Sequence, residues 1–570
     1  MNYPTPAIVS QGAVRRLPRA ALLLFCLAYV LPGFIGRGPW KGADITAFGY
    51  MAELALGASD WLAPKLLGFA PEVDALLPYW LGAWAMQVAP AWVSPDLAAR
   101  IPFVLLLVLT LLATWYGTYY LARSPEAQPV AFAFGGEALP PDYARALADG
   151  GLLAFIACLG LAQLSHETTP ALAQLCFTAL SFYALAALPY RTVTPWLAGI
   201  TGLAGLALSG APTMAALIGT GSAVIYLLVR PPAPESARSK LGVALGIMAV
   251  TIAVMVMSSL LDLWRWRIEF PEPTGQEWRS LGRLLLWFTW PAWPLALWTL
   301  WRWRHQLFRK GVLGRHLALP LWFVGVSLVA TFSTASADRS LLLALPALAA
   351  LAAFSLPTLG RSVAALIDWF TLLFFSGCAL VIWVVWIALQ TGFPQQPAAN
   401  VARLAPGFEH SFSFATFSIA ALATLAWAWL TKWRVGRHRA AIWKSLVLPA
   451  GGAALCWLLL MTLWLPLLDY ARSYGPLVQR VARVVKHAPC VQTQGLSRSQ
   501  LAALQFHGQM TLVNATSEIQ CPWLIIDKRS LATLDLLAKP PLWIIDSTVQ
   551  HPSDPAETLI LFRRSIGSKL

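Results

Sequence analysis

The sequence has 570 residues, of which 58% are hydrophobic and only 12% are charged, and its mean hydropathy is +0.62. Soluble domains carry about 25% charged residues, so this composition excludes an ordinary soluble protein and predicts an α-helical polytopic membrane protein. The net charge of +15 falls in loops between apolar runs, which is typical of cytoplasmic loops and argues against a nucleic-acid partner.

The N-terminal residues 1–19 are polar and basic, and the apolar run 20–35 after them predicts an uncleaved first helix whose N-terminus is cytoplasmic. A long segment, 36–77, follows on the outer side. Its prolines rule out one spanning helix, so we expect short interfacial helices there, one of them at 47–56.

Further apolar runs predict a bundle of about 13 transmembrane helices in all. They cover residues 101–121, 151–164, 171–188, 195–208, 213–229, 241–261, a run that ends near 301, 317–332, 341–354, 369–389, 415–430 and 446–467. The basic loops that start at Arg230, Arg302 and Lys432 all fall inside under one topology, and the odd number of spans then puts the C-terminus outside.

Residues 468–570 are polar and differ from the spanning region 1–467. Short β-like runs at 511–514, 523–527, 542–546 and 558–562 alternate with helix-like segments at 476–485 and 497–505. This pattern predicts a small outer α/β domain. Cys490 and Cys521 lie in it, and an oxidising compartment would allow a disulfide between them, a question that the sequence leaves open.

Five of the 26 acidic residues fall within residues 36–80, which indicates an active-site rim: Asp44, Glu53, Asp60, Glu72 and Asp74. Asp44 follows the first helix, where a carboxylate near a substrate can accept a proton from an incoming hydroxyl. The alternative is a solvated loop acid or a helix N-cap.

His166 and Glu167 lie at the tip of a predicted outer hairpin, SHETTP. They are candidates for a second acid/base pair or for metal ligands, and the alternative is a polar turn. One His with one Glu is a weak metal signal, and no Cys/His spacing indicates a metal site. A divalent metal cofactor therefore stays an open question.

Several arginines break the positive-inside trend because they fall on the outer side, at 265, 267, 279, 283 and 339. A guanidinium group can hold phosphate oxygens in a bidentate manner, so these residues are candidates for binding a lipid phosphate. The alternative is that they snorkel beside the interfacial tryptophans. The sequence contains no P-loop, GxSxG or HExxH motif.

Three stretches resemble glycosyltransferases of the GT-C type, in particular the bacterial aminoarabinose transferases and protein O-mannosyltransferases. The stretches are WKGADITAFGYMAEL (40–54), LLPYWLGAWAMQVAPAWVSPDLAARIPFVLLLVL (76–109) and ADRSLLLALPALAALAA (337–353). The resemblance implies inverting transfer of a sugar from a polyprenyl-phosphate donor to a lipid, glycan or protein acceptor. It also implies a multi-pass protein of the bacterial inner membrane, with transfer on the periplasmic side.

By this resemblance Asp44 matches the catalytic acid, and His166 and Glu167 lie where the second outer loop often carries an acid. The family usually has a Lys before its Pro-Tyr-Trp segment, where this chain has Asp74 and Ala75, and the late Tyr pair is replaced by Ser340 and Leu341. Lys65, Arg265 or Arg339 would hold the phosphate in their place. The full set of residues expected to bind the substrate is Lys65, Tyr79, Arg100, Arg265, Arg267 and Arg339.

Two other classes of function are compatible with the sequence. A transporter or lipid flippase predicts decisive polar residues in mid-span, whereas the candidates here cluster at the outer ends of helices. A receptor or assembly protein predicts that the C-terminal domain is essential and Asp44 is dispensable.

Overall fold

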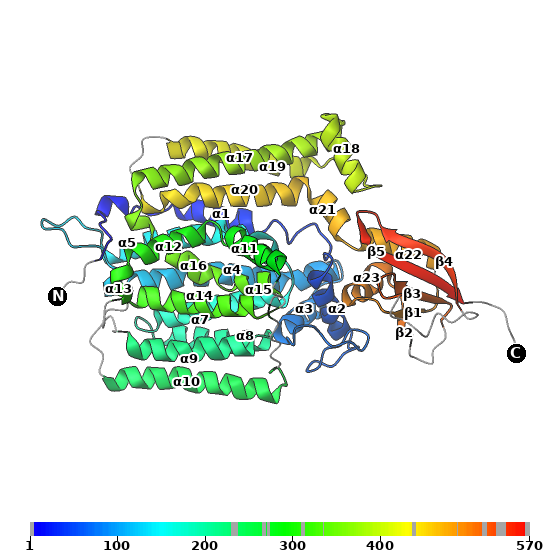
Figure 1. Ribbon diagram of the computed structural model, residues 1–570, viewed down its shortest axis with the longest axis horizontal. Helices are drawn as coiled ribbons and strands as arrows, with labels where there is room; N and C mark the ends of the chain where they lie inside the picture. Colours follow the sequence, from blue (N-terminus) through cyan, green and yellow to red (C-terminus); the bar gives the residue numbers. More distant parts are fainter. Residues whose placement is uncertain are drawn as a thin grey trace. The chain divides into compact units, whose positions relative to one another are not determined.

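The computed structural model describes residues 5–229, 237–264, 270, 274–308, 314–334, 336–435, 441–486, 488–515, 521–531 and 543–564. It is mostly helical, with one five-stranded sheet near the C-terminus (Figure 1). The chain divides into two compact units. Unit 1 comprises Met1–Phe34, Pro102–Leu380 and Ala415–Thr462, and unit 2 comprises Ile35–Ile101, Val381–Phe414 and Leu463–Leu570. The domain boundary expected at residue 467 remains a prediction.

Unit 1 is a helical bundle. Its helices are α1 (Arg19–Val30), most of α4 (Pro95–Ala122), α5 (Pro140–Ala157), α6 (Leu161–Leu164), α7 (Pro170–Ala187), α8 (Val193–Leu208), α9 (Pro212–Leu228), α10 (Ala237–Leu260), α11 (Gly275–Phe288), α12 (Ala292–Arg302), α13 (Arg304–Phe308), α14 (Arg315–Phe332), α15 (Ala337–Leu342), α16 (Leu345–Ala353), much of α17 (Arg361–Thr391), α19 (Phe414–Val435) and α20 (Val447–Leu463).

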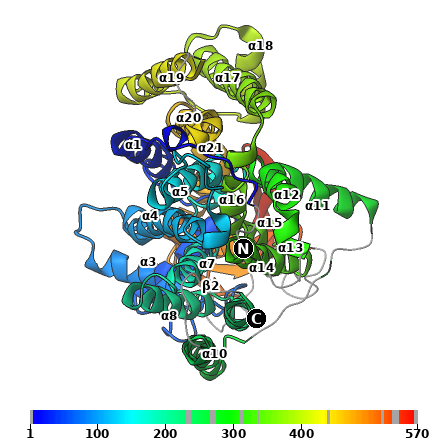
Figure 2. The same ribbon diagram turned by 90° about the vertical axis from the view of Figure 1, so that its left-hand side faces the viewer.

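Within the described ranges, eight helices are long and apolar enough to cross a membrane, and three shorter apolar helices, α1, α8 and α9, accompany them. The α-helical polytopic membrane fold is therefore confirmed, while the count of about 13 spans stays a prediction. Helix α16 lies inside the bundle beside α5 and α12, as Figure 2 shows. Its sequence, LPALAALAA, is buried throughout, because small side chains let neighbouring helix backbones approach closely.

Unit 2 contains the segment after α1 and the C-terminal sheet. Its helices are α2 (Ala43–Ala55), α3 (Leu77–Val88), α18 (Gln395–Leu404), α21 (Leu465–Arg472), α22 (Gly475–Val485) and α23 (Arg498–Gly508). Helix α2 begins four residues before the helix expected at 47–56. It packs on α23 at Gly49, where an added Cβ would lie 2.7 Å from the Cβ of Ala502, so only glycine permits this spacing.

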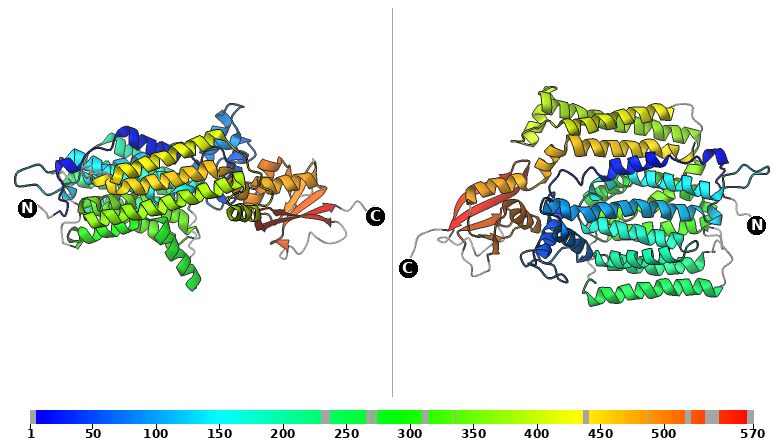
Figure 3. Two further views of the ribbon diagram at one scale, coloured as in Figure 1. Left: turned by 90° about the horizontal axis from the view of Figure 1, so that it is seen from above. Right: turned by 180° about the vertical axis from the view of Figure 1, so that it is seen from behind.

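The sheet has the strand order β2-β1-β3-β5-β4, with β1 parallel to β2 and β3, and β5 antiparallel to β3 and β4. Figure 3 shows the strands side by side, with α22 against them. The strands are β1 (Val491–Gln494), β2 (Leu512–Asn514), β3 (Trp523–Asp527), β4 (Trp543–His551) and β5 (Asp554–Arg564). The expected α/β domain is confirmed, although the polar strand β1, VQTQ, carries no apolar run that predicts it.

A disulfide joins Cys490 and Cys521, the residues just before β1 and near the start of β3, which answers the question that the sequence left open. The link closes a loop across 31 residues of sequence next to two paired strands.

Candidate functional site

The candidate residues fall into two groups, one in each unit, and each group is described within its own unit. Unit 2 holds Asp44, Lys65, Tyr79 and Arg100, and unit 1 holds His166, Glu167 and Arg339. Arg265 and Arg267 lie outside the described residues.

Asp44 lies in the first turn of α2 and is only 1% exposed. Its Oδ2 accepts a hydrogen bond from Nη1 of Arg37 at 2.8 Å and another from the backbone N–H of Trp40 at 3.1 Å. Gly42, at φ +85°, occupies the N-cap position and lets the chain turn into the helix, so Asp44 does not serve as the N-cap. Asp44 is therefore a buried carboxylate, oriented by one ion pair and one backbone donor.

Arg37 is the residue around which this group is built, and its side chain is also buried. Its guanidinium group lies 4.4 Å from the Trp40 ring centroid, and its carbonyl oxygen accepts a hydrogen bond from Arg100. Nη2 of Arg100 lies 3.4 Å from Asp96, one turn earlier on α4. Each arginine thus has its own carboxylate partner, Asp44 for Arg37 and Asp96 for Arg100, and loss of the carboxylate leaves its arginine as an uncompensated ion.

Asp469, on α21, holds the other side of the same segment. Its Oδ1 accepts hydrogen bonds from the backbone N–H of Gly38 at 3.0 Å and from Nε1 of Trp40 at 3.1 Å. The guanidinium group of Arg472, one turn later, lies 5.3 Å from the Trp40 ring. Segment 37–40 is thus clamped between two carboxylates that are 425 residues apart in sequence (469 − 44).

Sequence reasoning missed Arg37, Trp40 and Asp469. A local signal existed for Arg37, because it lies seven residues before Asp44 in a loop with glycines at 36, 38 and 42. No comparable signal marks Asp469, since an acid that follows a span reads as an ordinary interfacial residue.

Tyr79 and Lys65, the remaining two candidates in unit 2, contact residues that are close to them in sequence. Tyr79 of α3 is buried, with its ring 5.3 Å from that of Tyr50 on α2, so it contributes to the packing of these two helices. Lys65 is exposed, and its backbone N–H donates to Oγ of Ser59 at 2.7 Å.

In unit 1 the structure brings together Glu167 and Arg339, which are 172 residues apart (339 − 167). Nη2 of Arg339, on the short helix α15, lies 3.5 Å from Oε2 of Glu167, and Nε2 of Gln163 donates to Oε1 at 3.2 Å. The carboxylate is nearly buried, whereas the Arg339 side chain keeps 29% of its surface exposed. Arg339 is therefore held by a long ion pair and remains partly exposed to solvent.

His166 joins three helical elements of unit 1. Its Nε2 lies 3.0 Å from the carbonyl oxygen of Tyr29 in α1, and its Nδ1 faces the carbonyl oxygen of Ala162 and Oγ of Ser165. The ring packs against Phe34 and against Trp457 of α20, at centroid distances of 4.9 and 4.7 Å. These contacts fit a residue that positions the end of α1. Among the residues that the structure describes, no group of three or more His, Cys, Asp or Glu side chains could hold a metal.

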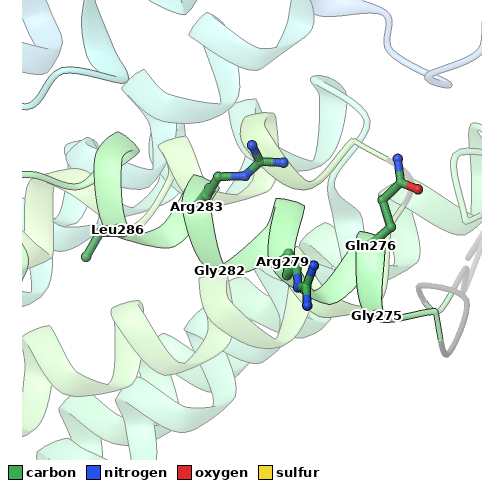
Figure 4. A pocket seen from close by; sticks show the side chains of 6 residues that line it. All are labelled: Gly275, Gln276, Arg279, Gly282, Arg283 and Leu286. Atoms are coloured by element: carbon green, nitrogen blue, oxygen red, sulfur yellow. The ribbon is translucent and has the colours of Figure 1, made fainter.

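Two of the candidate outer arginines, Arg279 and Arg283, lie on successive turns of α11 (Figure 4). They line an open groove of about 810 Å³ together with Gln276 and Leu286. Helix α11 contacts α15, and the backbone N–H of Gly160 donates to the carbonyl oxygen of Phe288 at its end. Arg279 and Arg283 therefore lie on a helix that contacts α15, the helix that carries Arg339.

Two histidines in unit 2 contact Ser473, directly after α21. Nε2 of His551 lies 2.9 Å from the Ser473 carbonyl oxygen, which can only accept, so His551 carries its proton on Nε2. His507 faces Oγ of Ser473 at 3.4 Å. Burial lowers the pKa of both histidines. The hydrogen bond to Ser473 raises the pKa of His551, and the charge of Asp469 raises that of His507, but burial has the larger effect in both cases.

Acidification from pH 7.5 to 5.5 is expected to lower the melting temperature of the purified protein. The unfolded histidines bind protons at about pH 6.5, above the lowered pKa of the folded ones, so the stability is present above that pH and is lost below it. Intrinsic fluorescence during heating measures the effect. The double variant His507→Gln/His551→Gln should flatten the pH dependence, and an unchanged slope in that variant would show that other groups cause it.

The sequence matches no model of a known protein family, and no curated protein matches it. Its fold, in contrast, is similar to that of ArnT from Cupriavidus metallidurans. The apo structure of ArnT aligns with a TM-score of 0.57 and 12% identity, over 95% of this chain and 96% of that one. The structure of the same protein bound to undecaprenyl phosphate aligns with a TM-score of 0.54 at the same identity and coverage. The chain therefore has the GT-C fold along nearly its whole length.

Proposed function

We propose that the protein is an inverting glycosyltransferase of the bacterial inner membrane, which takes a sugar from a polyprenyl-phosphate donor. The observation that carries this proposal is the shared fold over 95% of the chain with ArnT, an aminoarabinose transferase that has been solved with undecaprenyl phosphate bound. The acceptor is a lipid, a glycan or a protein.

Asp44 is the proposed general base. The acceptor hydroxyl attacks the anomeric carbon of the donor, the bond from that carbon to the phosphate oxygen breaks, and the proton of the hydroxyl passes to the Asp44 carboxylate. The polyprenyl phosphate leaves with the electron pair, and the single displacement inverts the anomeric centre. Arg37 and the Trp40 N–H keep the carboxylate oriented before the reaction.

Arg339 is the proposed cation for the departing phosphate. Its partial exposure and its long ion pair with Glu167 allow the guanidinium group to turn toward phosphate oxygens. Glu167 is the proposed second acid/base group, and His166 positions the end of α1. Arg100 supports Arg37, and Lys65, Tyr79, Arg265 and Arg267 stay proposed substrate contacts.

Transfer on the periplasmic side is supported by the disulfide, which persists in oxidising compartments, and by the basic loops that start at Arg230, Arg302 and Lys432, because such loops are typical of the cytoplasmic side. A divalent metal remains an open proposal.

The test is an assay of the purified protein in nanodiscs with a panel of undecaprenyl-phosphate-linked hexoses, pentoses and amino sugars. We expect release of undecaprenyl phosphate with one donor when membrane extract supplies the acceptor. A deletion strain should accumulate the same donor, as measured by lipid mass spectrometry. Absence of both release and accumulation would refute a polyprenyl-phosphate sugar as the substrate.

A further inference from the structure

Unit 1 contains an apolar groove between α1, α19 and α20, with a volume of about 350 Å³. We call it the α1/α19/α20 groove. Its walls include Phe25 of α1, Trp427 and Leu430 of α19, and Leu455 of α20. Figure 2 shows α1 and α19 on the same side of α20.

Small residues create this space. Gly451 of α20 lies in the floor, where an added Cβ would come within 2.8 Å of Leu430 and 3.3 Å of Phe25. Ala28 and Ala454 also line the groove. A bulkier residue at 451 would therefore fill the groove from its floor.

One end of the groove is bordered by tryptophans and cations. Trp433 and Trp443 line this end and stack with ring centroids 6.4 Å apart. Nζ of Lys444 lies 5.1 Å from the Trp433 ring, and Nε1 of Trp443 donates to the carbonyl oxygen of Arg15. Stacked tryptophans beside a cation are typical of the level of lipid headgroups.

The charge at this end is strongly positive. The basic side chains on the described segments that border it are Arg15, Arg16, Arg19, Lys432, Arg434 and Lys444. Two of these cations are paired: Nε of Arg434 donates to Asp368 of α17 at 3.2 Å, and Nη2 of Arg16 lies 3.3 Å from Asp142 of α5. Asp149 of α5 accepts a hydrogen bond from the backbone of Leu17. Lys444 is nearly buried, so its charge faces a partly desolvated site where an anion binds more strongly than at an open surface.

We propose that the α1/α19/α20 groove binds one anionic phospholipid of the bilayer, with an acyl chain in the groove and the phosphate at Lys444. From Val447 to Leu458, α20 lines ~16 Å of groove at 1.5 Å per residue, about the depth of one leaflet. An undecaprenyl chain is several times longer.

The bound lipid braces helices that carry the contacts of His166. Trp457 of α20 packs on His166 and donates from Nε1 to the carbonyl oxygen of Pro32, and Tyr29 of α1 faces the same imidazole. Filling the groove therefore fixes α1 against α20.

Native mass spectrometry of the delipidated full-length protein tests this proposal, with phosphatidylglycerol and phosphatidylethanolamine of the same acyl chains as probes. We expect one tightly bound phosphatidylglycerol molecule per protein and weaker binding of phosphatidylethanolamine. Lys444→Met keeps the length of the side chain beside Trp433 but removes its charge. The affinity for phosphatidylglycerol should fall ~5-fold, since one cation at the headgroup contributes about this much to the binding constant. Lys444→Arg should retain binding. Gly451→Leu should abolish the site for both lipids.

The control is Arg302→Gln, which removes an exposed cation at the end of α12 and should leave lipid binding unchanged. Wild-type phosphatidylglycerol affinity in Lys444→Met, or wild-type stoichiometry in Gly451→Leu, would overturn the proposal. Competition by undecaprenyl phosphate at equal concentration would overturn it as well, because the groove would then belong to the donor. The proposal does not depend on sugar transfer, so a failed transfer assay leaves it standing.

Discussion

Asp44→Asn is expected to lower the turnover of sugar transfer by about a thousandfold, with little change in the KM for the donor. Asparagine has nearly the same shape but cannot accept the proton of the acceptor hydroxyl, and general base catalysis contributes roughly 10²- to 10⁴-fold. Initial rates of undecaprenyl phosphate release in nanodiscs measure the change. Asp44→Glu keeps the carboxylate and should retain part of the activity.

Asp44→Asn is also expected to lower the stability of the protein, because Asp44 forms a buried ion pair with Arg37. Asp44→Asn leaves Arg37 as a buried, uncompensated charge, which typically costs about 3 to 5 kcal/mol. A loss of activity could then reflect a disturbed fold around segment 37–40. The activity of the single variant alone does not separate a catalytic Asp44 from a counter-ion.

The double variant Arg37→Gln/Asp44→Asn separates these two roles. It removes both charges, so the melting temperature should recover most of what Asp44→Asn loses, while Trp40 can still donate to the asparagine oxygen. A catalytic base predicts recovered stability without recovered turnover. Recovered turnover in the double variant would show that Asp44 serves only to balance Arg37.

Much of the fold could be predicted from the sequence because its signals are local. Long apolar runs specify the helices of unit 1, and the alternation of short runs after residue 468 specifies most of the C-terminal sheet. Strand β1 was not expected, because VQTQ acquires its conformation from pairing with β2 and β3 rather than from its own composition.

The surroundings of the candidate site could be predicted only in part. Asp44 and Arg339 stand out in sequence, one as an acid after the first helix and one as a cation against the charge trend. Glu167 also stands out, but its pairing with Arg339 does not, and neither does the contact between Trp40 and Asp469, because these contacts join segments that are 172 (339 − 167) and 429 residues apart. Such pairs depend on tertiary packing, which a single sequence does not encode as a pattern.

Arg339→Gln is expected to raise the KM for the polyprenyl-phosphate donor by about 10- to 100-fold, with a smaller change in kcat. A hydrogen bond to a charged group contributes roughly 1.5–3 kcal/mol, and loss of the phosphate contact should appear mainly in donor binding. Arg339→Lys keeps the charge but loses the bidentate fork, so its donor KM should lie between those of the wild type and Arg339→Gln. Arg191→Gln, at an exposed arginine between α7 and α8, is the matched control.

Glu167→Gln tests whether Glu167 transfers a proton or only positions Arg339. If Glu167 transfers a proton, its loss should lower kcat and leave the donor KM near that of the wild type, because Arg339 stays available to the phosphate. If Glu167 only holds Arg339 in place, both variants should raise the same KM and the double variant should add nothing further. A donor KM within twofold of wild type in Arg339→Gln would exclude Arg339 as the phosphate ligand and direct attention to Arg279 and Arg283 on α11.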